Sequence, residues 1–76
     1  MMNQHSSPYT IVEFIDRDEC EAVPTAWIVS DKGSYCSRWP PFAGASRLVE
    51  AITSRTKPAH NWLQYDVRIL GHAGRL

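Results

Sequence analysis

The sequence predicts a small α+β domain in which one helix covers an antiparallel sheet of about four strands, in the order β-β-β-α-β. Three observations support this class: segments that alternate apolar and polar residues, polar turns between them, and one segment with helical periodicity. Curling of the strands into a partly open barrel is the close alternative. The 76 residues leave room for one core, because a chain of this size buries only roughly 60–65% of its unfolded surface.

The first two strands are expected to form a hairpin. Residues 9–15 are rich in β-branched and aromatic side chains, and one alternating set could face a core: Thr10, Val12 and Phe14. Four carboxylates in residues 16–21 predict a polar turn that reverses the chain. The second strand is expected at residues 21–29 and is interrupted near Thr25, because Pro24 cannot donate a hydrogen bond to a ladder.

The remaining elements follow a turn in which Gly33 can adopt a positive φ. A third strand is expected at residues 35–39 and is ended by two prolines. The helix is expected at residues 43–55, where apolar side chains recur at i, i+3, i+4 and i+7: Ala45, Leu48, Val49 and Ile52. The last strand is expected at residues 61–70, with Tyr65, Val67 and Ile69 facing inward and Gln64, Asp66 and Arg68 outward.

The module itself is expected to span residues 9–70. Residues 1–8 lack the basic start and apolar segment of a secretory signal, so they are expected to form a flexible lead-in. Residues 71–76 contain two glycines and are expected to be a tail or linker stub. Apolar runs reach only a few residues, against roughly 20 for a bilayer span, so no membrane partner is expected.

Charge argues against a strongly basic nucleic-acid binder, because eight basic and eight acidic residues cancel. Residues 1–50 hold four cations and seven anions (4 − 7 = −3), and residues 51–76 hold four cations and one anion (4 − 1 = +3). Two solvated faces are the expected explanation. A head-to-tail homodimer and a weakly basic DNA-binding face are the alternatives; the DNA face would use Arg47, Arg55, Lys57 and Arg68.

Metal and catalytic sites are not expected, and neither is a cofactor. The possible zinc ligands, Cys20, Cys36, His60 and His72, are never closer than twelve positions, whereas structural zinc ligands pair within about two to five. The acidic turn lacks the glycine of a calcium-binding loop. The chain shows no nucleophile elbow and no glycine-rich loop, so an enzyme is not expected. Without a secretory signal, both cysteines are expected to be reduced thiols.

The aromatic residues are the candidates for a binding role. Aromatic and arginine side chains are common interface anchors, and the candidate interaction surface combines the exposed parts of Trp27, Arg38, Trp39, Phe42 and Trp62. An aromatic cage for methylated lysine is an alternative, with rings available from Tyr9, Trp27, Tyr35, Trp39, Trp62 and Tyr65. Most of these rings must fill the core of so short a chain. The two prolines before Phe42 lack a PxxP pattern and are expected to form a corner.

Taken in order, five segments resemble a small N-terminal module of animal proteins: YTIVEF, EAVPTAWIV, YCSRWPPF, LVEAI and KPAHNWLQYDVRIL. Such proteins are often transposon-derived or chromatin-associated and include those that carry the DUF4806 domain. Two residues separate Cys36 from Trp39, where one is commoner. The resemblance implies a nuclear, non-catalytic module that binds a partner protein or a second copy of itself. Binding of DNA and reading of methylated lysine in histone tails remain the alternatives.

Overall fold

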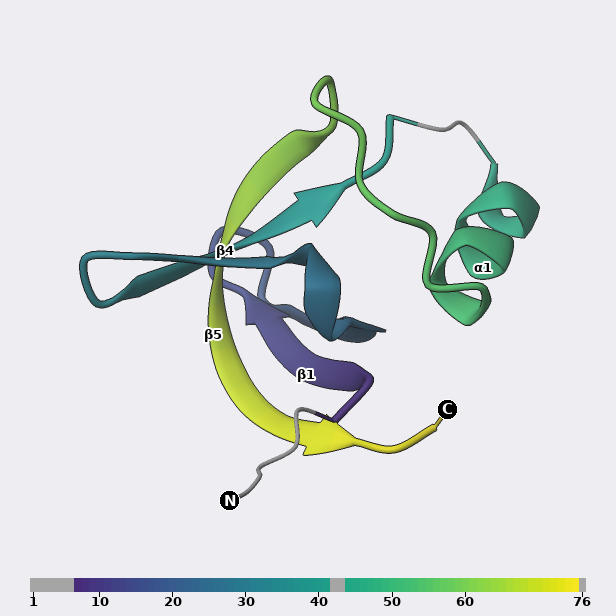
Figure 1. Ribbon diagram of the computed structural model, residues 1–76. Coiled ribbons are helices and arrows are strands. Elements are labelled where there is room, and N and C mark those ends of the chain that lie inside the picture. Colours follow the sequence, from purple (N-terminus) through teal and green to yellow (C-terminus); the bar gives the residue numbers. More distant parts are fainter. Residues whose placement is uncertain (1–6, 42–43, 76) are drawn as a thin grey trace, which may run out of the picture.

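The structure, a computed structural model, describes residues 7–41 and 44–75. Five strands form one antiparallel sheet in the order β2-β1-β5-β4-β3, which curls around the core while α1 lies to one side (Figure 1). The predicted α+β class, with a small antiparallel sheet and one α-helix in the described residues, is confirmed. The elements are β1 (Tyr9–Phe14), β2 (Glu19–Pro24), the 3₁₀ helix η1 (Thr25–Trp27), β3 (Ile28–Asp31), β4 (Ser34–Trp39), α1 (Ala45–Thr53) and β5 (Leu63–Ala73).

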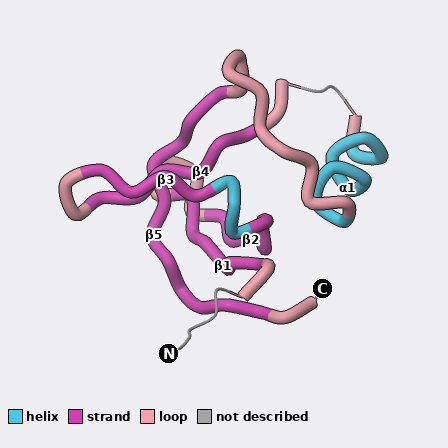
Figure 2. The backbone as a smooth tube through the Cα atoms, in the orientation of Figure 1, coloured by secondary structure: helices cyan, strands magenta, loops and turns pink. Residues whose placement is uncertain are grey.

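The fifth strand arises because the predicted second strand is two strands. Pro24 ends β2, as expected for a residue without an N–H for the ladder. The short helix η1 then carries the chain to β3 at the opposite edge of the sheet (Figure 2). The two edge strands are therefore linked through η1 but do not pair with each other, so the curled sheet is not closed (Figure 1).

The hairpin of β1 and β2 is longer than predicted. Its turn is closed by Asp18, whose φ is 54° and whose N–H donates to the carbonyl of Phe14 at 2.9 Å. Glu19 pairs with Phe14, and Glu21 pairs with Val12. The expectation that β2 begins at Glu21 is therefore wrong, because the ladder continues up to the turn. Residues that pair across a ladder share a face, so both carboxylates lie on the face of buried Val12 and Phe14.

Strand β5 joins the two hairpins. It pairs with β4 through residues 63–67 and with β1 through residues 67–73, with Leu70 as the unpaired residue of a bulge. The predicted end of the strand at Leu70 is wrong, because Gly71, His72 and Ala73 pair with the start of β1. The inward orientation of Val67 is confirmed, since it is buried between exposed neighbours.

Helix α1 is shorter than predicted and uses a different face. The predicted start at residue 43 lies outside the described residues. Leu48 is partly buried and Ala51 and Ile52 are buried, whereas Val49 is 60% exposed and Ala45 is also exposed. Of the predicted apolar stripe, Leu48 and Ile52 are therefore confirmed as inward-facing, and Ala45 and Val49 are wrong. The helix contacts the rest of the protein along one narrow side only.

Hydrogen bonds attach the C-terminal end of α1 to the sheet. The Tyr9 hydroxyl donates to the carbonyls of Ile52 and Thr53 at 3.2 and 3.1 Å. Beyond them Arg55 has a φ of 50°, and the N–H of Thr56 donates to the carbonyl of Ala51 at 2.9 Å. This is the geometry of a Schellman motif, formed without the usual glycine.

The start of the described chain is held by Thr25. Its N–H donates to the carbonyl of Pro8 at 2.8 Å, and its hydroxyl donates to that of Ser7 at 2.6 Å. Ser7 and Pro8 are therefore not part of the expected flexible lead-in. Residues 1–6 lie outside the described part of the chain.

The core is built mainly from the concave face of the sheet. The predicted inward set of β1 is confirmed, since Thr10, Val12 and Phe14 are all buried. Trp27 on η1 is fully buried, and its indole N–H donates to the carbonyl of Thr56 at 2.7 Å. This bond joins η1, which links the two edge strands, to the segment that follows α1.

Candidate functional site

A row of aromatic rings runs from the core to the surface. Each ring meets the next edge to face, the arrangement that aromatic quadrupoles favour. The distances between ring centres are 5.0 Å for Trp62 and Trp27, 5.9 Å for Trp27 and Trp39, 5.3 Å for Trp39 and Phe14, and 6.2 Å for Phe14 and Tyr65. Well-packed rings at one end of this row hold the outer rings in place.

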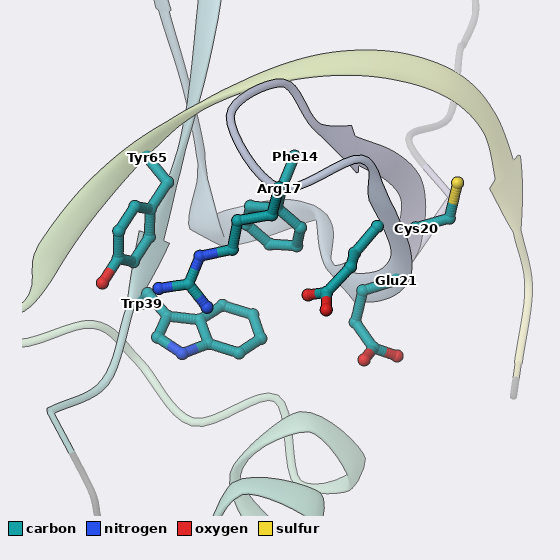
Figure 3. Close-up of a pocket in the computed structure, with 7 residues that line it drawn as sticks. Phe14, Arg17, Cys20, Glu21, Trp39 and Tyr65 are labelled. Atoms are coloured by element: carbon teal, nitrogen blue, oxygen red, sulfur yellow. The ribbon is translucent and has the colours of Figure 1, made fainter.

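The outer end of the row forms one wall of a recess (Figure 3). The recess is small, with a cavity volume of about 70 Å³, and is lined by Phe14, Arg17, Glu19, Cys20, Glu21, Trp39 and Tyr65. Its three rings come from β1, β4 and β5, and its two carboxylates come from β2. The curl of the sheet is what brings the edge strand β2 opposite the rings. We call this site the aromatic recess.

The two glutamates face the recess because of the hairpin register. Residues 19 and 21 share the concave face with core residues. Apolar side chains are the usual occupants of this face of a sheet. Both glutamates are exposed, and neither forms an ion pair within residues 7–41 and 44–75. They therefore give the aromatic recess two solvated negative charges.

A cation already lies over one wall of the aromatic recess. The guanidinium carbon of Arg17 is 5.2 Å from the ring centre of Tyr65, within the range of a cation–π interaction. Figure 3 shows this guanidinium beside Tyr65 and Trp39, with the Glu21 carboxylate farther away, beyond the Trp39 ring in this view. Arg17 reaches this position from the turn between β1 and β2. The aromatic recess thus already holds a planar cation against one of its rings.

The thiol of Cys36 lies on the outer face of the sheet. Its Sγ donates a hydrogen bond to Oδ1 of Asp66 at 3.3 Å, across the ladder of β4 and β5. Partial burial raises the pKa of the Cys36 thiol, and the hydrogen bond and charge of Asp66 raise it further. The protonated thiol is therefore favoured, the opposite of what an activated cysteine requires.

The predicted interaction surface is only partly exposed. The expectation of an exposed indole is wrong for Trp27, which is 0% exposed, and nearly so for Trp62, which is 8% exposed. Both rings fill the core instead. Trp39 is half-buried and lines the aromatic recess, and Phe42 lies outside the described residues. Arg38 is half-buried and donates through Nη2 to the carbonyl of Ala59 at 2.8 Å.

The residues of the alternative DNA-binding face lie on two sides of the molecule. Arg47 and Arg55 belong to α1 and its C-terminal turn, followed by Lys57. Arg68 alternates with buried Val67, so it faces outward on β5, and it forms an ion pair with Glu13 at 2.8 Å. Helix α1 lies on the concave side of the arc that β5 makes (Figure 1). These four cations therefore do not form one continuous surface.

Two of the six rings considered for an aromatic cage, Trp39 and Tyr65, line the aromatic recess. Tyr9, Trp27 and Trp62 are buried, and Tyr35 lines a separate, more open depression with Ile15. Phe14 is buried as expected but also lines the recess, and both glutamates line it although they were expected in a solvated turn. A hairpin closed by a four-residue turn after Phe14 would have placed the glutamates opposite Val12 and Phe14.

Other site classes receive no support. No group of three or more metal-binding side chains occurs in the part of the chain that the structure describes. Within the same residues, no helix has the length and apolar character to cross a membrane. Comparison with known proteins finds no matching family, curated protein or solved structure. The resemblance to the module of DUF4806-containing proteins stays a prediction.

Proposed function

We propose that this protein is a non-catalytic interaction module whose aromatic recess binds a cationic side chain of a partner protein. The observation that carries this proposal is the position of Arg17, whose guanidinium lies over the Tyr65 ring in a recess that Glu19 and Glu21 also line. A site that holds the protein's own cation in this way has the chemistry to hold another. The pairing of aromatic rings with acids matches the requirements of an ammonium or guanidinium ligand.

Methylated lysine fits this chemistry best. Methylation keeps the positive charge of the ammonium but weakens its hydration, so less free energy is lost when rings replace water. Three rings, from Phe14, Trp39 and Tyr65, can contact the methyl groups, while Glu19 and Glu21 supply opposite charge. The alternative that the sequence offered, a reader of methylated lysine, is therefore the specific form of the proposal.

An NMR titration tests the proposal. A short blocked peptide is prepared with a central lysine that is unmodified, dimethylated or trimethylated, and with norleucine as the uncharged analogue. The Trp39 indole signal and the amides of residues 15–21 should move, most strongly with a methylated lysine. Tyr65→Leu should weaken binding roughly 2- to 30-fold, because a cation–π contact contributes about 0.5–2 kcal/mol.

Tyr35→Leu is the matched control, since Tyr35 is a partly exposed aromatic residue outside the aromatic recess. Its affinity for the methylated peptide should equal that of the wild type. Equal binding of the norleucine peptide, or unchanged spectra at millimolar peptide, would contradict the proposal.

Self-association and DNA binding, the alternatives that the sequence offers, each have a direct test. Self-association is tested by light scattering, where a strict monomer at high micromolar concentration would contradict it. DNA binding is tested by a gel shift at low salt, since contacts to phosphates weaken as salt rises.

A further inference from the structure

We infer that the partner binds as an extended, basic peptide that adds a strand to the free edge of β2 and inserts its cationic side chain into the aromatic recess. This inference rests on the proposed function and specifies the conformation and charge of the ligand. It follows from three features of β2: its position in the sheet, the direction of its side chains and its charge.

Strand β2 is at one edge of the sheet. It pairs with β1 on one side, and among the described residues no strand pairs with its other side. In an antiparallel ladder, every second residue of an edge strand directs its N–H and C=O away from its neighbour. These groups can form main-chain hydrogen bonds with an extended peptide, as in other cases of strand addition.

The side chains of β2 link this edge to the aromatic recess. Glu19 and Glu21 line the recess, whereas Ala22 alternates with them and belongs to the other face of the sheet. A peptide strand would lie about 4.8 Å from β2, and every second side chain would project on the face of the two glutamates. A lysine at such a position stands at the margin of the aromatic recess and can extend its ammonium toward Tyr65 and Trp39.

Charge selects the occupant of this edge. Residues 16–21 carry one arginine and four carboxylates (1 − 4 = −3). Two copies of β2 placed edge to edge would bring four glutamates on one face together, and inward-pointing charges are a known protection against such pairing. A strand with lysines on either side of the inserted residue would instead neutralise these charges. The occupant is therefore a basic segment of another protein rather than a second copy of this chain.

The experiment uses a blocked peptide of sequence Thr-Lys-Val-trimethyllysine-Val-Lys-Thr. Two further peptides carry backbone N-methyl groups, each on one of the two alternating sets of peptide nitrogens. Only one set faces β2, so only one of these peptides should lose affinity, by tenfold or more. If N-methylation acted through peptide conformation alone, both peptides would weaken equally, and the inference would be wrong.

Hydrogen exchange supplies the second measurement, and free trimethyllysine separates the two proposals. The full peptide should slow the exchange of alternate amides in β2, while the free amino acid should shift the Trp39 indole signal without slowing them. Binding of the peptide with unchanged exchange in β2 would overturn strand addition and leave the proposed function standing. Absence of any shift with either ligand would overturn both strand addition and the proposed function.

Replacing the two flanking lysines of the peptide by glutamates should weaken binding at least tenfold at low salt. Unchanged affinity would overturn the expected role of charge.

Discussion

The guanidinium carbon of Arg17 lies 5.2 Å from the centre of the Tyr65 ring, so a cation of the protein itself occupies the place proposed for the partner's cation. An incoming ammonium must displace this group and is repelled by its charge. We therefore expect Arg17→Gln to strengthen binding of the trimethyllysine peptide about two- to fivefold, because an exposed cation–π contact contributes about 0.5–1 kcal/mol. Isothermal titration calorimetry measures the difference.

Lys32→Gln is the control for the loss of charge, because Lys32 lies in the turn between β3 and β4 and does not line the aromatic recess. It should change the affinity less than Arg17→Gln does. Weaker binding by Arg17→Gln would show that Arg17 contacts the ligand and does not compete with it.

The two carboxylates of the aromatic recess should contribute to affinity mainly through charge. The double variant Glu19→Gln and Glu21→Gln should weaken peptide binding roughly two- to thirtyfold at low salt, since each exposed pair contributes about 0.2–1 kcal/mol. Its charge-matched control is Asp31→Asn with Glu50→Gln, two exposed acids outside the recess. Calorimetry at low and high salt should show the difference shrinking as salt screens the charges. Equal losses in both double variants would show that net charge alone acts.

The hydrogen bond between Trp27 and Thr56 should contribute to stability. Trp27→Phe keeps an aromatic ring but removes the N–H that donates to the Thr56 carbonyl at 2.7 Å, and it leaves a small cavity beside Trp62. We expect a loss of about 2 kcal/mol in the free energy of unfolding, measured by urea titration. Tyr35→Phe, at an exposed ring, should change stability by less than about 0.5 kcal/mol. An unchanged unfolding midpoint for Trp27→Phe would contradict the structural role of this bond.

The end of α1 offers a stabilising substitution. Arg55 has a φ of 50° in the Schellman motif, a conformation that is unfavourable for a residue with a Cβ. Arg55→Gly should therefore raise the free energy of unfolding by about 0.5–1 kcal/mol, the strain relieved less the entropy cost of glycine. Glu50→Gly, within α1, should lower it by about 1 kcal/mol because glycine disfavours a helix interior. Thermal unfolding of both variants checks the opposite signs, and a destabilised Arg55→Gly would show that the arginine side chain matters more than its backbone.

Alkylation should reveal the environment of Cys36. Burial and Asp66 raise the pKa of this thiol, and the thiolate is the reactive form. The rate of reaction with iodoacetamide should therefore rise at a higher pH in the folded protein than in the urea-unfolded chain, as followed by mass spectrometry of the Cys36 peptide. Asp66→Asn removes one of the causes and should shift the folded profile to lower pH. Identical profiles for the wild type and this variant would contradict the contribution of Asp66.

Local patterns were enough to predict most of the elements. Alternation identified β1 and most of β5, and Pro24 identified the break after β2, because each depends on residues close in the chain. The aromatic recess was not predicted, since it requires Phe14, Trp39 and Tyr65 from three strands and a register that turns Glu19 inward. The buried face of α1 was mistaken for a similar reason: periodicity defines a stripe, but the contact with Tyr9 decides which part of it is covered.

The position of β5 in the chain also affects the order of folding. The hairpin of β1 with β2 and the hairpin of β3 with β4 each form from neighbouring residues, whereas β5 contacts both and follows them in the chain. Pairing of β1 with β5 closes a loop of more than fifty residues, and such distant contacts slow folding. Until β5 docks, the two hairpins have their concave faces uncovered. The carboxylates that β2 directs inward would then protect an unfinished sheet from pairing with another copy of the chain.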